Sequence, residues 1–175
     1  MTEALYLVDA SIYVFRSYYS IPDTFHARNG ELVNAVYGYT QFLLDLLDRK
    51  PELISVAFDE SLTTCYRNDI YPEYKANRAL PDKNLEFQLK QCQEITRLLG
   101  LHSLCLKDFE ADDIIGTLLA KFGKNRQAII VTRDKDLGQL LRKEDRLWDF
   151  AADVWSGPAE IEAKFGVTPL QLADF

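Results

Sequence analysis

The chain has 175 residues, 47% of them hydrophobic, which suits one globular domain with a substantial core. Its net charge of −7 argues against a nucleic-acid binder that works through bulk positive charge, although a local basic patch stays compatible with it. No apolar stretch is long enough to span a membrane, and the first residues lack the pattern of a signal peptide. Cys65, Cys92 and Cys105 show no paired spacing and only two histidines are present, so we expect a protein of the reducing cytoplasm without a His/Cys zinc site.

The first sixty residues predict a strand, two helices and a second strand. These elements cover residues 5–8, 13–19, 34–50 and 53–58. Asn34 is expected to cap the second helix. Both strands are continuously apolar, and an aspartate follows each of them, Asp9 after the first and Asp59 after the second.

The segment from Thr63 to Leu80 differs in composition, with aromatic and basic residues and few aliphatic ones. These residues are Tyr66, Arg67, Tyr71, Tyr74, Lys75 and Arg78. Asn84 is then expected to cap a helix that Gly100 ends, and residues 102–106 predict a short strand.

Four carboxylates lie within six residues directly before an apolar helical run that Gly123 ends. They are Asp108, Glu110, Asp112 and Asp113. One or two acids would cap the helix and complement its dipole. Four acids repel one another, and no basic residue lies between Lys107 and Lys121 to relieve the repulsion. A bound cation would relieve it.

The remainder of the chain predicts two further strands and two helices. Residues 128–131 form a buried strand followed by Asp134 and Asp136, and residues 146–150 form an outer strand. Pro158 is expected in a first helical turn, and residues 167–175 begin another helix.

Strands alternate with helices, and the strands expected in the core are continuously apolar. This pattern predicts an α/β fold with a mostly parallel twisted sheet and helices on both faces. The carboxyl ends of parallel strands share one edge, where ligands bind, so the acids that follow the strands are expected to gather there. Aspartate is common in strand-to-helix loops, but this explains one or two acids better than the whole set.

Carboxylate ligands without histidine or cysteine select Mg²⁺ or Mn²⁺. Two such ions about 4 Å apart can activate water, hold a scissile phosphate and stabilise the leaving oxygen. A serine nucleophile lacks support because no histidine is near a candidate, and no glycine-rich phosphate loop is present. The acids therefore favour a divalent-metal site over helix capping alone.

Several stretches match the pattern of one protein family. They are Leu7-Val-Asp9-Ala-Ser with Arg16, Asn34-Ala-Val-Tyr-Gly38, Ala57-Phe-Asp59, Arg67 through Tyr74-Lys75-Ala-Asn-Arg78, Glu110-Ala-Asp112-Asp113-Ile-Ile-Gly116, and Asp134-Lys-Asp136 followed by Gln139-Leu. On these stretches the chain resembles the bacterial 5′→3′ exonuclease and flap-endonuclease family, from residue 5 to its end. The motif Glu110-Ala-Asp112-Asp113, followed some twenty residues later by Asp134-Lys-Asp136, is highly specific for this family in combination. Either motif alone is weak evidence for the family.

The resemblance implies a 5′-nuclease core similar to PIN domains that hydrolyses DNA phosphodiesters with two Mg²⁺ or Mn²⁺ ions. The ligands implied for the first ion are Asp9, Asp59, Glu110 and Asp112. Those implied for the second ion are Asp113, Asp134 and Asp136. The implied partner is DNA with 5′ ends or flaps. The implied protein is a monomer in the bacterial cytoplasm, associated with the nucleoid, that acts in DNA replication and repair.

The resemblance also implies a helical arch, here called the arch segment (residues 63–84). Lys75 and Arg78 match its base, where basic groups contact the scissile phosphate, and Arg67 matches a supporting residue. A cation near the phosphate stabilises the charge that develops during attack, and arginine can bind phosphate through two hydrogen bonds. The tyrosines of the segment can stack on unpaired bases, at about 1–3 kcal/mol each, or pack beneath a surface loop.

Two features depart from the family pattern. Arg133 stands where the family usually has glycine. Two roles are open for its side chain: a cation behind the metal ligands, which would weaken metal binding, or a contact to phosphate. The family also continues with a Gly-Asp-x-x-Asp-Asn segment that completes the second site and a helix-three-turn-helix that binds duplex DNA and potassium. Neither lies within residues 1–175, so we expect a truncated N-terminal domain with impaired activity, a weaker second metal site and weak DNA binding.

Other functional classes remain open from the sequence. A PIN-type ribonuclease shares the acid-lined sheet but lacks the stretch from Tyr74 to Arg78. A haloacid-dehalogenase-type phosphatase needs Asp-x-Asp after the first strand, which Asp9-Ala-Ser does not supply. A receiver domain leaves Asp134 and Asp136 unexplained. A non-catalytic protein that binds branched DNA is the alternative outside the enzymes.

Overall fold

A computed structural model describes residues 3–61, 64–76 and 82–174. Within these residues the chain forms one six-stranded sheet with the order β3-β2-β1-β4-β5-β6. The strands are β1 (Leu5–Asp9), β2 (Leu53–Phe58), β3 (His102–Cys105), β4 (Ala128–Val131), β5 (Arg146–Asp149) and β6 (Val154–Ser156). Neighbouring strands are parallel except β5 and β6, which pair in antiparallel fashion.

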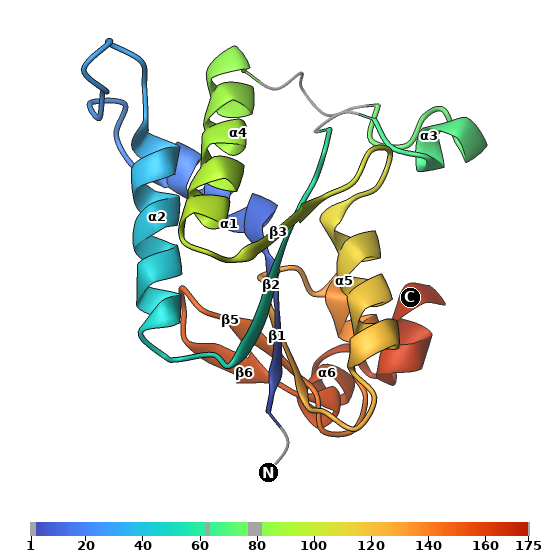
Figure 1. The fold of residues 1–175 in the computed structure, drawn as a ribbon. Coiled ribbons are helices and arrows are strands. Elements are labelled where there is room, and N and C mark those ends of the chain that lie inside the picture. The colour runs from blue at the N-terminus through green and yellow to red at the C-terminus, as the bar shows by residue number, and fades with distance from the viewer. Residues whose placement is uncertain (1–2, 62–63, 77–81, 175) are drawn as a thin grey trace.

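Helices cover both faces of the sheet (Figure 1). The helices are α1 (Ala10–Ser20), α2 (Asn34–Leu47), α3 (Arg67–Ile70), α4 (Lys83–Leu98), α5 (Ala111–Phe122) and α6 (Pro158–Phe165), with 3₁₀ turns η1 (Asp136–Leu140) and η2 (Pro169–Asp174). Helices α1, α2 and α4 lie on one face, and α5 and α6 lie on the other. The predicted α/β class is therefore confirmed. No helix in the described part of the chain is long and apolar enough to cross a bilayer.

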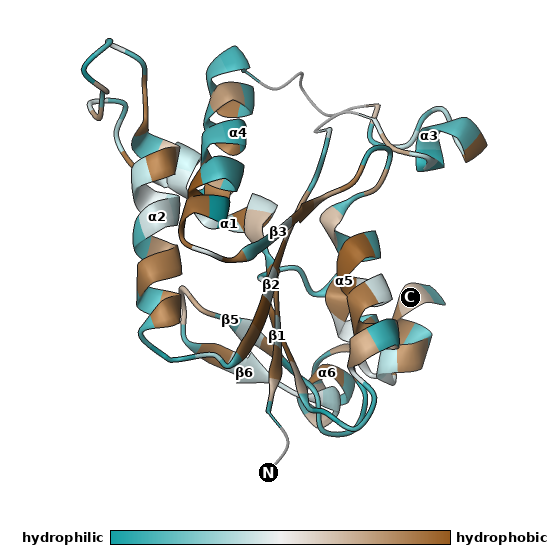
Figure 2. Ribbon diagram, viewed as in Figure 1, coloured by the Kyte–Doolittle hydropathy of each residue, from teal (hydrophilic) through white to brown (hydrophobic). Residues whose placement is uncertain are grey.

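Apolar side chains form one core on each face of the sheet. Figure 2 shows bands of apolar residues along α2 and α5. The buried residues of both helices recur at the spacing of one helical face. Tyr39, Leu43 and Phe58 are fully buried on the face of α1, α2 and α4. Leu7 and Ile130 are fully buried beneath α5, on the other face. The strands are therefore buried on both sides, which explains their continuous apolar sequences.

The strand order places a crevice beside the central strand β1. The chain leaves β1 towards β2 and β3 on one side and later enters β4 on the other side. Such a reversal opens a crevice at the carboxyl ends of the two strands on either side of it. The register aligns Asp9 with Ala57 and Val8 with Val131, so the residues after β1, β2 and β4 emerge at one level.

Both predicted asparagine caps are wrong. Asn34 is the first residue of α2, and its side chain donates to the carbonyl oxygens of Tyr18 and Ile21, both at 2.9 Å. The start of α2 is instead capped by Gln88 of α4, whose Oε1 accepts from the backbone N–H groups of Ala35 and Val36. Asp82 caps α4 by accepting from the backbone of Asn84 at 3.1 Å.

The C-terminal predictions also need correction. Residues 146–150 were expected to form an outer strand, but β6 pairs outside β5. The helix expected over residues 167–175 is the short 3₁₀ turn η2. Pro158 does begin α6, and the carboxylate of Glu160 accepts from the backbone of Gly157 at 2.7 Å.

Gly38 allows α1 and α2 to pack closely. A Cβ atom at this position would lie 2.7 Å from Ser17 Oγ and 2.8 Å from Ser17 Cβ, and would also meet Ile21. Ser17 is buried and its hydroxyl donates to the carbonyl oxygen of Tyr13, so it cannot move aside freely. Gly116, in the middle of α5, has room: a Cβ would meet only Leu140, at 3.7 Å.

We predict opposite effects for the same substitution at these two glycines. Gly38→Ala should lower the free energy of unfolding by about 1–3 kcal/mol because it forces the helices apart. Gly116→Ala should leave stability unchanged or raise it by up to about 1 kcal/mol, because alanine favours the helix. Urea denaturation of both variants measures this, and equal effects at the two positions would contradict the close packing of α1 on α2.

Candidate metal centre

Five carboxylates line one cavity at the carboxyl edge of the sheet. They are Asp9, Asp59, Glu110, Asp112 and Asp134. The cavity holds about 180 Å³, and Lys75 lines it together with Ser11, Ile12 and Phe15. The acids come from the ends of β1, β2 and β4 and from the start of α5, so the structure brings together five of the seven predicted metal ligands.

Asp9 lies deepest in this group. It is 6% exposed, and the hydroxyl of Thr132 donates to its Oδ2 at 2.8 Å. The same hydroxyl accepts from the backbone of Asp134 at 2.9 Å, so Thr132 joins the ends of β1 and β4. Burial, and then the charges of Asp59, Asp112 and Asp134, raise the pKa of Asp9 to about 8. The sequence prediction missed Thr132, although its place directly after β4 was a usable signal.

Asp59 and Asp112 extend the same negative field. Asp59 Oδ1 accepts from the backbone of Ala111 at 2.8 Å, and its own N–H donates to Ser11 Oγ at 2.9 Å. Burial is the main cause that raises the pKa of Asp59. Burial, followed by the charges of Asp134 and Asp59, raises the pKa of Asp112 to about 6. Divalent cations among these groups would favour their ionised forms.

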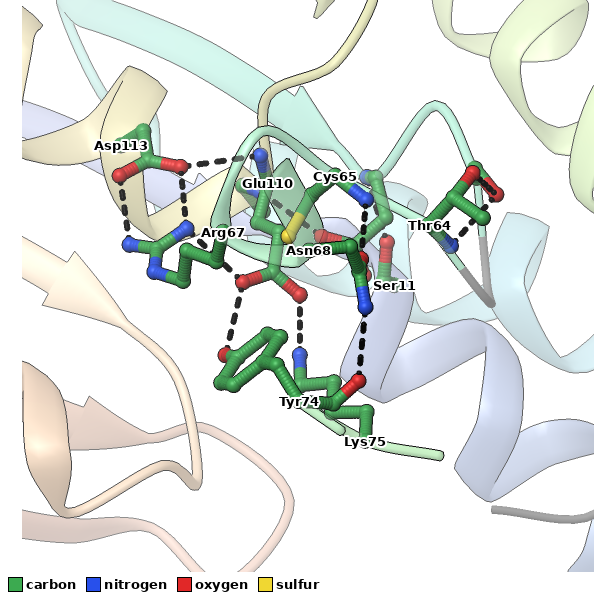
Figure 3. A network of polar contacts seen from close by, with 12 residues as sticks. Ser11, Thr64, Cys65, Arg67, Asn68, Tyr74, Lys75, Glu110 and Asp113 are labelled. Carbon is green, nitrogen blue, oxygen red and sulfur yellow. Dashed lines mark hydrogen bonds and ion pairs between the residues drawn. The ribbon is translucent and has the colours of Figure 1, made fainter. Parts of the chain in front are cut away.

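Glu110 is held by three donors from the described part of the arch segment (Figure 3). Its Oε2 accepts from Arg67 and from the hydroxyl of Tyr74, both at 3.0 Å. Its Oε1 forms an ion pair with Lys75. Glu110 is 8% exposed, so these contacts neutralise a nearly buried charge. The predicted supporting residue Arg67 therefore lies beside a predicted ligand, as does Lys75.

Asp113 does not line the cavity. Its carboxylate binds Arg67 through two hydrogen bonds of 2.8 and 2.7 Å. It also accepts from the backbone of Glu110 at 3.1 Å, which is half of a capping box at the start of α5. Capping therefore explains one acid of the cluster. Asp108 is exposed and occupies a left-handed backbone conformation with φ 66°.

The other predicted site residues lie beside the cavity or outside the described residues. Asp136 is exposed at the start of η1, and its N–H donates to Asp134 Oδ1 at 2.9 Å. Arg133 is exposed and paired with Asp149 through Nε at 3.1 Å, so it does not line the acidic cavity. Arg78 lies outside the described residues.

The three tyrosines of the arch segment have different surroundings. Tyr66 packs against Phe109, with ring centroids 5.5 Å apart, and Arg67 lies over its ring. Tyr71 is exposed and its hydroxyl donates to Glu73. Tyr74 points to Glu110. Only Tyr71 presents its ring freely to solvent, whereas the other two contribute to local packing.

The donor set fits Mg²⁺ or Mn²⁺ by its chemistry, because it consists of hard carboxylate oxygens. Across residues 3–61, 64–76 and 82–174, no three acidic, histidine or cysteine side chains are already arranged around one ion position. Some oxygens of these carboxylates already have protein partners: Asp9 accepts from Thr132, Asp59 accepts from Ala111, and Glu110 pairs with the arch segment. Metal binding would require carboxylate oxygens within the cavity to draw together around one ion position.

Fold and cavity together define an α/β domain with an acidic pocket at the carboxyl edge of a parallel sheet. Residues 4–166 match the family described as 5′-3′ exonuclease, N-terminal resolvase-like domain. The chain therefore belongs to this 5′-3′ exonuclease family.

Individual relatives agree with this assignment. DNA polymerase I of Mycobacterium bovis is 36% identical over 178 residues, which cover 98% of this chain and 20% of that protein. A 5′-3′ exonuclease of Buchnera aphidicola is 31% identical over 171 residues, which cover 96% of this chain and 59% of that protein. The chain thus spans a fifth of one relative and about three-fifths of the other.

A solved structure shares the fold. The bacteriophage T5 D15 flap endonuclease, in a complex with DNA and metal ions, matches with a TM-score of 0.73 and 17% identity. The match covers 97% of this chain and 64% of that one.

We predict that stability falls as pH rises when a chelator removes divalent ions. The pKa values of Asp9, about 8, and Asp112, about 6, lie above the ordinary value of 3.8. Their contribution to stability is fully present below about pH 4 and is lost as pH rises through these folded-state values, because the folded protein then binds more protons than the unfolded chain. Saturating Mg²⁺ should flatten this dependence.

Urea denaturation in EDTA between about pH 5 and pH 8 measures the effect. Asp112→Asn should reduce the slope because it removes one of the titrating carboxylates. Asp45→Asn is the matched control, since Asp45 is an exposed acid of α2 whose carboxylate accepts a hydrogen bond from Gln41. A stability that stays level or rises with pH in EDTA would contradict the crowding of buried acids.

Proposed function

We propose that this chain is the nuclease domain of a metal-dependent 5′-3′ exonuclease and flap endonuclease that hydrolyses DNA phosphodiesters. The observation that carries the proposal is the convergence of five carboxylates and Lys75 on one cavity. Carboxylates supply ligands for Mg²⁺, and a cation beside them can meet a phosphate. The DNA and metal ions in the complex of the T5 flap endonuclease, whose fold this chain shares, support the same substrate.

The proposed ligands divide into two groups. Asp9, Asp59, Glu110 and Asp112 would hold one divalent ion, and Asp134 would contribute to the second position. Asp113 would complete the second position only if it leaves Arg67. Asp136, which is exposed, would have to turn towards the same position. Two ions, when bound, would activate a water and stabilise the leaving oxygen.

The chain's own side chains supply orientation and charge. Thr132 and the backbone of Ala111 hold Asp9 and Asp59 towards the cavity. Arg67 fixes Glu110 relative to α5, which makes it a positioning residue. Lys75 is the proposed contact to the scissile phosphate, since its ammonium lines the cavity. Arg78 is proposed to assist from the arch segment by resemblance alone.

We expect Asp112→Asn to reduce Mg²⁺-dependent cleavage of a 5′-labelled DNA flap by roughly a hundredfold or more, beyond the range for residues that only support a metal ligand. The assay uses the 175-residue chain in excess over DNA, with Asp45→Asn as the control that keeps full activity. Cleavage that persists in EDTA or in Asp112→Asn would overturn the proposal. A preference for single-stranded RNA over the flap would favour a PIN-type ribonuclease instead.

We also expect this chain to cut more slowly than the T5 D15 protein under the same conditions. The match covers 64% of that protein, and we propose that its remaining part adds surface for DNA. The difference should be largest at low DNA concentration, where weak binding limits the rate. Equal cleavage rates at every DNA concentration would contradict the expected impairment.

A further inference from the structure

A second cavity adjoins the acidic cavity at the carboxyl edge of the sheet. It has a volume of about 230 Å³ and is lined by residues 132–135, after β4, and by side chains of β5, β6 and α6. We call it the β5–α6 pocket. Asp134 lines both cavities, so the two meet at the end of β4.

Three cationic side chains line the β5–α6 pocket, namely Arg133, Lys135 and Lys164. Arg133 is held by Asp149, which accepts from its Nε at 3.1 Å. A guanidinium held through Nε keeps its two terminal amino groups as donors. Both lysines are exposed, and within residues 3–61, 64–76 and 82–174 neither takes part in an ion pair. The pocket therefore offers donors and positive charge to an anion.

The surroundings of these cations also suit an anion with an apolar body. Asp149 is paired with Arg133, and the carboxylate of Glu160 accepts from the backbone of Gly157 at 2.7 Å, so two acids of the pocket already have partners. The remaining lining includes the apolar side chains of Leu147, Val154, Ile161 and Phe165. A phosphodiester with its sugar has both properties, because the phosphate is charged and the sugar carries C–H surface.

The order of the strands places the pocket relative to the proposed metal ions. Asp59, Asp9 and Asp134 lie at the ends of β2, β1 and β4, which are consecutive in the sheet, and β5 follows. The arch segment contacts Glu110, which precedes the residue bonded to Asp59 and so lies at the β2 end of this row. The pocket lies at the β5 end, two strand spacings or roughly 10 Å from β1.

We propose that the β5–α6 pocket binds an internal backbone phosphate of the DNA strand whose scissile phosphate occupies the acidic cavity. This inference rests on the proposed function and deepens it, because it adds a second contact on the same substrate. Arg133 and Lys164 would bind the phosphate oxygens, within a few nucleotides of the cut, while the apolar lining packs against the sugar. Two contacts on one strand would align the scissile phosphate over the carboxylates.

Lys164→Gln is the sharpest test, because Lys164 belongs to α6 and is far in sequence from every proposed metal ligand. In single-turnover cleavage of the flap, it should raise the half-saturating protein concentration roughly fivefold, as expected for one lost charge-assisted contact at an exposed site. The cleavage rate at saturation should change by less than about twofold. The slope of log affinity against log salt should become shallower by about 0.7–0.9, the value for one phosphate contact.

Two further variants separate a phosphate contact from a general loss of charge or stability. Lys164→Arg keeps the cation and should bind DNA like the unchanged chain. Lys124→Gln is the matched control, since Lys124 is an exposed lysine that lies between α5 and β4, at the amino edge of the sheet. It should leave affinity and salt slope unchanged. Thermal unfolding checks that each variant is folded.

A scan of the substrate locates the contacted phosphate. Fluorescence anisotropy measures binding to flaps that carry one neutral methylphosphonate linkage each, with the label on the uncut strand. The protein carries Asp112→Asn so that the DNA stays intact. At one internal linkage, the neutral group should weaken binding roughly fivefold when Lys164 is present and cause no further loss together with Lys164→Gln.

Three results would overturn the inference: unchanged affinity in folded Lys164→Gln, an equal loss in Lys124→Gln, or a Lys164 effect that no internal linkage removes. A Lys164 effect that depends only on the 5′-terminal phosphate is an instance of the third result. The cleavage assay judges the proposed function separately. Binding that follows the predicted scan without metal-dependent cleavage by the unchanged chain would reject the nuclease proposal and leave the pocket standing, whereas cleavage with a silent scan would reject only the pocket.

Discussion

Repulsion between buried carboxylates is the constraint on which the rest of this structure depends. Parallel strands that end at one level bring acids from distant parts of the sequence into a cavity of about 180 Å³. Burial and mutual charge raise the pKa of Asp9 to about 8, so the ionised form is costly without a cation. The fold offsets part of this cost with donors such as Thr132 and Ala111, and with the cations Arg67 and Lys75. It therefore carries a site that a divalent ion would stabilise.

The arch segment is part of this electrostatic balance. Its described residues touch the cavity through Glu110, which accepts hydrogen bonds from Arg67 and Tyr74 and pairs with Lys75. A change at the metal position would therefore be felt by the segment proposed to meet DNA. Under the proposed function, this one carboxylate would link ion binding to the position of the arch base.

The sequence predicted the elements whose evidence is local. The strands at 53–58 and 128–131 have the predicted bounds because they are continuously apolar and buried on both faces. It also predicted that acids would gather at one edge, since parallel topology requires it. It did not predict the cap of α2, because Gln88 lies 53 residues from Ala35 in sequence. It missed β6, whose three residues include exposed Val154 and Trp155 and show no strand pattern.

The candidate site shows the same difference between features with local evidence in the sequence and features that depend on long-range contacts. The sequence indicated which acids follow strands, and five of them meet. It could not indicate that Asp113 bonds Arg67, because that contact depends on where α3 lies. The bond from the backbone of Glu110 to Asp113 is local and agrees with the helix capping that the sequence allowed for one or two acids. The place of Thr132 directly after β4 was a local signal, but its bond to Asp9 spans 123 positions of the sequence and depends on the pairing of β1 with β4.

The central claim is that this cavity gathers its carboxylates around divalent cations. Anomalous diffraction from crystals of the chain grown with Mn²⁺ tests it most directly, because manganese scattering locates each ion independently of the protein atoms. The account predicts a manganese peak within about 2–2.5 Å of oxygens from Glu110, Asp112 and a strand-end aspartate. Manganese bound only elsewhere on the protein, or a cavity that excludes it, would contradict the account.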